Sequence, residues 1–253
     1  MSTGEPFYLS ALNTVKGNLE PSAPSANIIV APDGDVSVAS YLQTVADSLN
    51  QMWTDRFLKS GYITPTVAVT IVTPSETVQT DCGVEPITAT TNNAYYCPSD
   101  VTHDEYDNTV VGQILLPLTT FERMWLGDIF GDTSDIAGDF TSAIIVAHEF
   151  SHHVVDEMTQ QSEDAGKLIT PITGKNNELI ADCFAGVWLA ESYYDQHLVG
   201  DDFEEAAAAL SAIGDIVPDN VDPHGTGTER VDALTLGYNN KMQSTVCVTT
   251  YWK

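Results

Sequence analysis

The chain has 253 residues, of which 43% are hydrophobic, so it is long enough for one large domain or two small ones with a proper core. It carries 36 acidic residues against 9 basic ones, a formal net charge of −27. This balance excludes nucleic-acid partners, because affinity for nucleic acids depends on Lys and Arg neutralising phosphates. A high-salt habitat, an acidic extracellular protein and calcium sites are all compatible with such acidity.

The N-terminal region predicts an irregular arm. Residues 1–35 are rich in Ser, Pro, Asn and Ala and contain one short apolar stretch, Asn27 to Val30, which predicts a strand. Met1 to Pro6 lacks a basic segment followed by an apolar one, so we expect a signal peptide to be absent or already removed. No run approaches 18 apolar residues, which predicts no transmembrane segment. Residues 36–253 are expected to form a single domain.

The first half of this domain predicts one helix and a small sheet. Apolar residues recur at helical spacing from Val36 to Ser60, and Gly61 follows as the expected helix end. Residues 64–72 and 109–117 are rich in β-branched residues and predict strands. Between them, an acidic stretch predicts a solvated surface loop, with a calcium site as the less favoured alternative. Its acidic residues are Asp100, Asp104, Glu105 and Asp107.

The second half predicts helices. After a short helix at 121–129 and a turn-rich connector at 131–139, Asp139 stands where the N-cap of the next helix is expected. That helix should end near Gln160, and a polar loop follows at 161–175. Further helices are predicted at about 177–197, 202–214 and 228–242, before a tail that contains Cys247.

The most informative motif lies on the helix that begins near Asp139. His148-Glu149-Phe150-Ser151-His152 is an H-E-x-x-H sequence, preceded by the apolar run 143–147, which predicts a buried helix. Residues four apart lie on one helix face, so both imidazoles can bind one zinc ion, with Glu149 beside the open position as general base. The alternative is a pair of histidines that are merely hydrogen-bonded.

A hydrolytic zinc site needs a third protein ligand. Asp156 continues the histidine face but lies one turn further along, so we expect it to point past the metal. Glu178 is preferred, because it opens a second helix on which Asp182, four residues later, can accept the other ring N–H of a ligand histidine. Small residues on that helix, Ala181, Ala185 and Gly186, should allow close packing on the H-E-x-x-H helix. Val155 and Met158 occupy the positions where the metzincin pattern requires Gly and His, which excludes that class.

Several motifs in the same order resemble the neutral zinc metallopeptidase family of bacteria, which belongs to the gluzincin-like H-E-x-x-H peptidases. The resemblance spans roughly residues 36–250 and rests on these stretches: Cys82-Gly83, Tyr96-Cys97-Pro98, 138–140, 147–154, 178–188, 211–215, His224-Gly225-Thr226 and Arg230-Val231. It implies His148, His152 and Glu178 as ligands of one zinc ion and Glu149 as the catalytic base. The chain departs from the family at Ser151, usually Gly, and at Pro223, usually Thr.

Residues outside the two metal-binding helices carry further expectations. His224 precedes a glycine in a turn and is a candidate for stabilising the oxyanion of a tetrahedral intermediate; a turn histidine that caps local backbone is the alternative. Arg230 is expected to bind substrate or to pair with a nearby acid. His153 is expected to be a hydrogen-bonding neighbour of the site, while Tyr193 and Tyr194 are weaker candidates as cleft donors. His103 and His197 are expected at the surface.

The even number of cysteines in a Thr-rich, Lys-poor chain indicates two disulfides and an oxidising compartment, with four buried thiols as the alternative. Three pairings are open from the sequence. We favour Cys183–Cys247, which would pin the C-terminal tail against the second ligand helix, over a zinc-binding Cys183 thiolate; Cys82–Cys97 is then the remaining pair.

Together these patterns predict an α+β, zincin-like domain with a small sheet and a helical half that holds the metal between two helices. The expected activity is zinc-dependent hydrolysis of peptide bonds in a peptide or protein substrate, at an extracellular or cell-surface location. Two alternatives stay open: a zinc hydrolase of a non-peptide amide, and a catalytically silent protein that zinc stabilises.

Overall fold

The computed structural model describes residues 37–83, 85–104, 106–129, 132–133, 138–166, 169–194, 202–215, 224–240 and 243–253. These residues form seven helices and three small sheets, so the fold is α+β as expected. The predicted arm at 1–35 and its strand at Asn27–Val30 lie outside the described residues, as do Pro223 and His197.

Helix α2 (Val38–Lys59) follows the predicted span. The Ser37 hydroxyl accepts a hydrogen bond from the backbone N–H of Ser40, which satisfies one of the free donors at the helix start. Gly61, just past the helix end, has φ +80°, a conformation that glycine adopts without steric cost. The apolar face of α2 is buried through large side chains such as Trp53 and Phe57.

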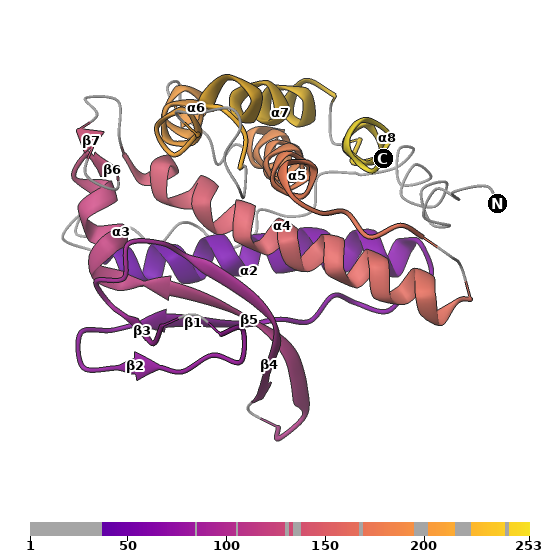
Figure 1. The fold of residues 1–253 in the computed structure, drawn as a ribbon, viewed down its shortest axis with the longest axis horizontal. Helices are drawn as coiled ribbons and strands as arrows, with labels where there is room; N and C mark the ends of the chain where they lie inside the picture. Colours follow the sequence, from indigo (N-terminus) through magenta and orange to yellow (C-terminus); the bar gives the residue numbers. More distant parts are fainter. Residues whose placement is uncertain are drawn as a thin grey trace.

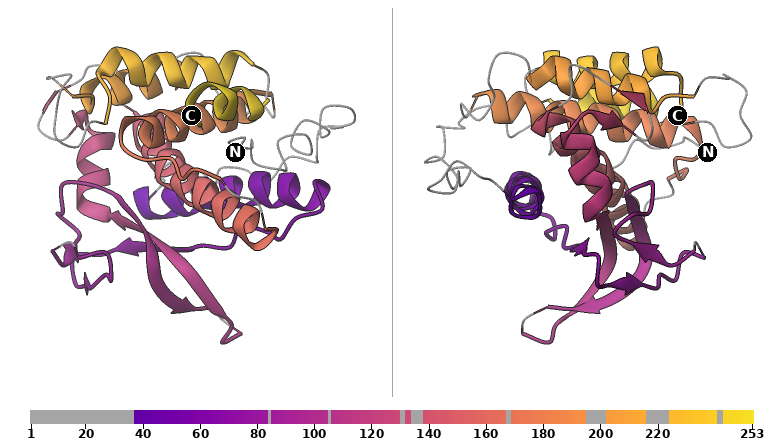
Figure 2. Two further views of the ribbon diagram at one scale, coloured as in Figure 1. Left: turned by 45° about the vertical axis from the view of Figure 1, so that its right-hand side comes forward. Right: turned by 90° about the vertical axis from the view of Figure 1, so that its left-hand side faces the viewer.

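A three-stranded sheet has the order β1–β5–β4. Strand β1 (Ala68–Val72) runs parallel to β5 (Thr109–Pro117), and β4 (Tyr95–His103) pairs antiparallel with β5 at the edge of the sheet. Beside it, β2 (Thr77–Val78) and β3 (Ile87–Thr88) form a two-stranded sheet. In all the ribbon views, the far end of the β4–β5 hairpin extends away from the body of the molecule (Figures 1 and 2).

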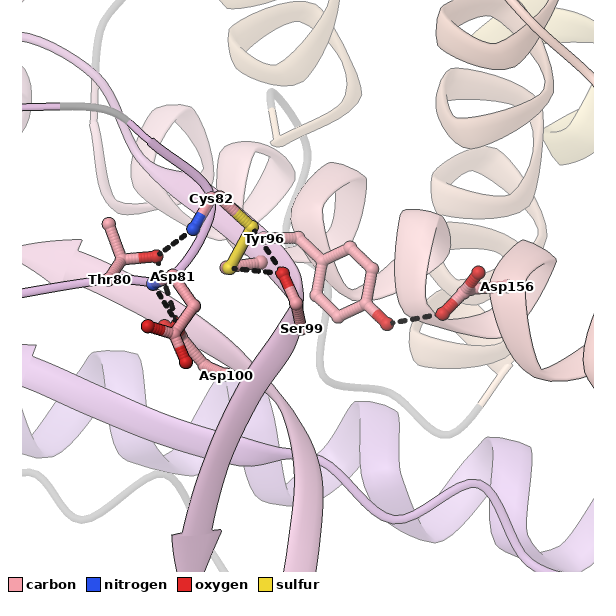
Figure 3. Close-up of a disulfide and its surroundings, with 8 residues drawn as sticks. Thr80, Asp81, Cys82, Tyr96, Ser99, Asp100 and Asp156 are labelled. Carbon is pink, nitrogen blue, oxygen red and sulfur yellow. Dashed lines mark hydrogen bonds between the residues drawn. A yellow bond between two sulfur atoms is a disulfide. The ribbon is translucent and has the colours of Figure 1, made fainter.

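Strand β4 corrects the expected acidic loop at Asp100, whereas Asp104 and Asp107 lie beyond the strand and are exposed, as expected. Asp100 belongs to this strand and is only 5% exposed. Its Oδ1 accepts hydrogen bonds from the backbone N–H of Asp81 at 2.6 Å and from the Thr80 hydroxyl at 3.0 Å. The Cys82–Cys97 disulfide lies beside this contact and joins the same two segments (Figure 3). The burial of Asp100 therefore follows from its role in holding the 80–82 turn against the sheet.

Helix α3 (Leu118–Trp125) is followed by the hairpin of β6 (Asp128–Ile129) and β7 (Asp132–Thr133), and then by α4 (Asp139–Asp164). The predicted N-cap was one residue late: Gly138 takes that position, and Asp139 lies in the first helical turn. From Phe140 to Ser151 every residue of α4 is buried. Figure 1 shows α4 between the sheet on one side and the C-terminal helices on the other.

The C-terminal helices are α5 (Lys175–Tyr194), α6 (Asp202–Ala212), α7 (Gly227–Asn239) and α8 (Thr245–Tyr251). The Cys183–Cys247 disulfide joins α8 to α5, so both favoured pairings are confirmed. Close packing occurs between α5 and α7, where a Cβ on Gly186 would clash with the Leu234 carbonyl and one on Gly237 with the Cys183 carbonyl. Gly186 was therefore wrongly assigned to the packing against α4.

Two further observations concern membrane-spanning helices and the disulfides. Among the described residues, none of the helices combines the length and the apolar composition that crossing a membrane requires. The two disulfides fit an oxidising environment, in which such bonds form and persist.

Candidate metal centre and cleft

Three side chains converge between α4 and α5. His148 and His152 lie one turn apart on α4, with their Nε2 atoms 3.1 Å from each other. Glu178, in the first turn of α5, places Oε2 at 3.2 Å from His148 Nε2 and Oε1 at 3.6 Å from His152 Nε2. One ligand atom from each residue lies within 4.8 Å of the other two. The three residues expected to bind metal are thus brought together.

The distances and the chemistry of this set fit a zinc ion. Donor atoms at 2.0–2.1 Å from a tetrahedral zinc are separated by about 3.3–3.4 Å, close to the separations seen here. Burial alone would lower the pKa of His148, but the charge of Asp182 and its hydrogen bonds raise the pKa to about 10. Burial alone would raise the pKa of Glu178, yet the hydrogen bonds with His148 and His152 lower it well below its usual range. The raised pKa of His148 shows that Glu178 and Asp182 favour a positive charge at this place, which a metal cation would also supply.

A buried ion pair contacts the ring nitrogen of His148 that faces away from Glu178. Its Nδ1 lies 2.8 Å from Oδ1 of Asp182, which accepts the ring N–H as expected. Arg230 on α7 donates from Nε to Asp182 Oδ2 and from Nη2 to Oδ1, both at 2.8 Å. Asp182 is fully buried and Arg230 is 3% exposed. Arg230 was expected either to bind substrate or to pair with a nearby acid, and the structure shows the pairing, with Asp182.

Sequence reasoning missed the partner of the second histidine. The side-chain amide of Asn177, in the first turn of α5, lies 3.2 Å from His152 Nδ1. Because amide oxygen and nitrogen are assigned from their partners, turning this amide lets its oxygen accept the N–H of His152. That hydrogen bond leaves Nε2 as the free lone pair facing His148 and Glu178. In the sequence, the only indication of this role for Asn177 was its position directly before Glu178.

These residues lie in an open cleft of about 730 Å³. Glu149 is on its wall, and no hydrogen bond to its carboxylate is found within the described part of the chain. The floor is the face of α4 that carries the lining residues from Ile145 to Thr159. One wall is the segment leading into β4, and much of the rest of the lining comes from the start of α5 and from residues of α6 and α7. The residues that line the cleft from the β4 side are Asn92, Asn93, Ala94, Tyr95, Tyr96 and Pro98.

His224 lines the same cleft, opposite β4, and its side chain is 51% exposed. The turn that carries it is held by Asp215, whose Oδ2 accepts backbone N–H groups from His224 at 2.7 Å and from Gly225 at 3.1 Å. The other oxygen of Asp215 lies 3.7 Å from His224 Nδ1. His224 is therefore presented to the cleft by a braced turn with a carboxylate beside its ring.

The remaining expectations on α4 are resolved by the contacts of three residues. Ser151 is fully buried and its hydroxyl donates to the Ala147 carbonyl at 2.6 Å, within the helix. His153 is buried against the sheet, and its Nδ1 lies 3.3 Å from the Tyr96 hydroxyl, so its expected place beside the metal site was wrong. Asp156 lines the cleft and accepts a hydrogen bond from Tyr96 at 3.0 Å.

His103 is exposed, as expected, whereas the side chains of Tyr193 and Tyr194 lie outside the described part of the structure.

Comparisons with known proteins now add to this geometry. Relatives include the "Uncharacterized protein YpfJ" of Escherichia coli K12, 26% identical over 229 residues that cover 83% of this chain and 71% of the relative. The "Uncharacterized protein Rv2575" of Mycobacterium tuberculosis H37Rv is 28% identical over 216 residues, 81% of this chain and 64% of the relative. No solved structure matches. The sequence model of the family described as "Putative neutral zinc metallopeptidase" matches residues 8–247, so the chain belongs to this family.

Proposed function

We propose that this protein is a zinc-dependent endopeptidase with a zincin-like fold, formed as one domain by residues 36–253. In this proposal His148, His152 and Glu178 hold one zinc ion, and Glu149 is the catalytic base. The observation that carries it is the convergence of three metal-binding side chains from α4 and α5 within an open cleft. Membership of a family described as a zinc metallopeptidase supports the same activity.

Zinc bound there would lower the pKa of a water molecule toward neutrality and polarise the carbonyl of the substrate. Glu149 takes one proton from the attacking water, whose oxygen adds to the carbonyl carbon of the scissile bond. The C–N bond then breaks, and Glu149 delivers the same proton to the leaving amine. A carboxylate without a fixed partner among the described residues suits this double transfer, because it can turn between the two positions.

His224 has the role of stabilising the negative oxygen that develops on the attacked carbonyl. A donor that is already fixed where charge develops contributes about 3–4 kcal/mol to such reactions. Asp215 supports this role, because its two backbone hydrogen bonds fix the turn and its second oxygen lies beside the imidazole of His224. The ring is thereby kept on the side of the cleft opposite β4.

The form of the cleft favours an extended peptide over a small amide. Its α4 floor runs from Ile145 to Thr159, about 21 Å at 1.5 Å per residue, which matches about six residues of an extended chain. In the part of the chain that the structure describes, β4 pairs only with β5. Its outer edge is therefore open to a substrate strand, the common mode of β-strand addition. The two disulfides support an extracellular or cell-surface location.

The decisive experiment compares zinc-loaded wild-type protein with Glu149→Gln on a denatured protein substrate. We expect the variant to retain zinc and to lose at least a hundredfold in cleavage rate, because the proton acceptor is gone. Glu163→Gln is the matched control, since it makes the same change on the exposed surface of α4. Equal cleavage by Glu149→Gln would refute the mechanism. Zinc-dependent thermal stability without cleavage of any peptide would instead identify a silent, zinc-stabilised protein, and cleavage of small amides alone a non-peptide hydrolase.

A further inference from the structure

Asp156 stands apart from the other charged residues of the cleft. The lining of the cleft contains three carboxylates, and two of them, Glu149 and Glu178, belong to the proposed zinc centre. Arg230 is the only Lys or Arg among the described residues that line the cleft, and two of its nitrogens donate to Asp182. Asp156 thus places a negative charge in the cleft that the proposed reaction does not use.

The carboxylate of Asp156 is held in place from the sheet. Tyr96, on the edge strand β4, donates its hydroxyl proton to Oδ2 at 3.0 Å, as Figure 3 shows. The Tyr96 ring is itself fixed, because it lies against Gly112 of β5, whose added Cβ would be 3.2 Å from the phenol oxygen, and against the ring of His153. Burial, followed by the charge of Asp156, raises the pKa of Tyr96, so the phenol remains a donor. One oxygen of Asp156 is therefore anchored, and a second is left to bind a ligand.

Apolar residues of the same cleft suit a long aliphatic side chain. Val155 lies next to Asp156 on α4, and Pro171 and Ile172 also line the cleft. Pro171 and Ile172 belong to the connection between α4 and α5, which ends at Lys175, shortly before the metal-binding Glu178. A cleft that offers both apolar side chains and a carboxylate suits Lys and Arg, which bury their methylenes and keep the charge in polar surroundings.

The spacing excludes the α-amine of the residue that carries the scissile carbonyl as the group that meets Asp156. The centre between His148 and His152 is six residues, about 9 Å along the helix axis, from Asp156. The α-amine of the residue that carries the scissile carbonyl lies about 2.5 Å from that carbonyl carbon, which is too short. A Lys or Arg side chain on a residue near the scissile bond adds roughly 6 Å of reach and can meet the carboxylate.

We propose that Asp156, positioned by Tyr96, forms a subsite for a Lys or Arg side chain of the peptide substrate. The inference rests on the proposed peptidase function and names its substrate class. The overall charge of −27 adds to the selection, because the field of an acidic protein draws cationic peptides toward its cleft. Asp156 acts here as a specificity-determining residue and Tyr96 as its positioning residue.

The test uses fluorogenic peptides in which one position at a time carries Lys or the uncharged norleucine. At the best position we expect kcat/KM to favour Lys by at least about fivefold in the zinc-loaded wild type, with less preference at high salt because exposed charges are screened. Asp156→Asn should bring the Lys-to-norleucine ratio close to one, and Tyr96→Phe should lower it. Asp164→Asn, an exposed change on the same helix outside the cleft lining, should keep the wild-type ratio.

Binding separates the failure of this proposal from the failure of the peptidase function. The affinities of the same Lys and norleucine peptides are measured on zinc-loaded Glu149→Gln, with and without Asp156→Asn. A Lys preference that disappears with Asp156→Asn supports the subsite even if the wild-type protein cleaves nothing. A preference that survives Asp156→Asn, equal affinity for both peptides, or no binding of either one overturns it.

Discussion

Replacing Arg230 by Met removes the cation that faces Asp182 behind the candidate metal centre while keeping most of the side-chain volume. Arg230 is 3% exposed and Asp182 fully buried, and two hydrogen bonds of 2.8 Å join them. After the change, the contact with His148 Nδ1 is the one hydrogen bond that remains to the Asp182 carboxylate within the described residues. The buried carboxylate would then have lost the larger of its two compensating charges, and only the His148 imidazole would still face it.

The size of the effect follows from this burial. Removing one partner of a buried ion pair costs about 3–5 kcal/mol, because the remaining charge stays desolvated. Arg123 provides the matched comparison: it also forms a close ion pair, with Asp128, but its side chain is 48% exposed. An exposed ion pair contributes about 0–1 kcal/mol. Arg230→Met should therefore lower the free energy of unfolding by at least about 2 kcal/mol more than Arg123→Met does.

The assay is urea unfolding of both variants and the wild type, with disulfides intact and zinc removed by chelation, so that metal binding does not contribute. A double variant, Arg230→Met with Asp182→Asn, should lose less stability than the sum of the two single variants, because the unpaired charge is removed. Equal losses of unfolding free energy for Arg230→Met and Arg123→Met, or strict additivity in the double variant, would show that Arg230 does not compensate the buried charge of Asp182.

Three further predictions concern packing and the departure at Ser151. Gly237→Ala should cost about 1–3 kcal/mol in urea unfolding, since its new Cβ meets the Cys183 carbonyl and forces α5 and α7 apart; an unchanged midpoint would contradict this. Replacing both Cys183 and Cys247 by Ala removes a disulfide between residues 64 positions apart and should lower the free energy of unfolding by about 4 kcal/mol. Removing the Cys82–Cys97 disulfide, whose residues are 15 positions apart, should lower it by about 3 kcal/mol. The reverse order would refute the loop-entropy argument. Ser151→Ala should change stability by less than about 1.5 kcal/mol and leave zinc affinity unaltered, because its hydroxyl bonds within the helix; a tenfold loss of zinc would contradict this.

The parts of the site that the sequence could predict are those set by local geometry. His148 and His152 are four residues apart on an apolar helix, and helical periodicity alone brings their rings together. Asp182 follows by the same rule from Glu178 on the second helix. The pairing of Arg230 with Asp182 stayed open, because 48 residues separate them and only the α5–α7 packing, made close by two glycines, brings them into contact.

Other elements depend on contacts that a single segment does not encode. Helix α8 went unpredicted because Thr245 to Tyr251 is rich in β-branched residues; its Cys247 disulfide and buried Val248 hold it against α5. Tertiary packing thus overrode local propensity. Strand β4 was not predicted because it contains the acidic residue Asp100, whose burial becomes acceptable only with donors from residues 80 and 81.

Zinc content per chain, measured by elemental analysis after dialysis, tests the central claim most directly. The account predicts about one zinc per wild-type chain and a large loss in Glu178→Gln, whose neutral amide is a poor ligand between His148 and His152. Glu157→Gln, on α4 but outside the converging set, should retain the metal. A wild-type chain that binds no zinc, or a Glu178→Gln variant that binds it as tightly as the wild type, would contradict the account.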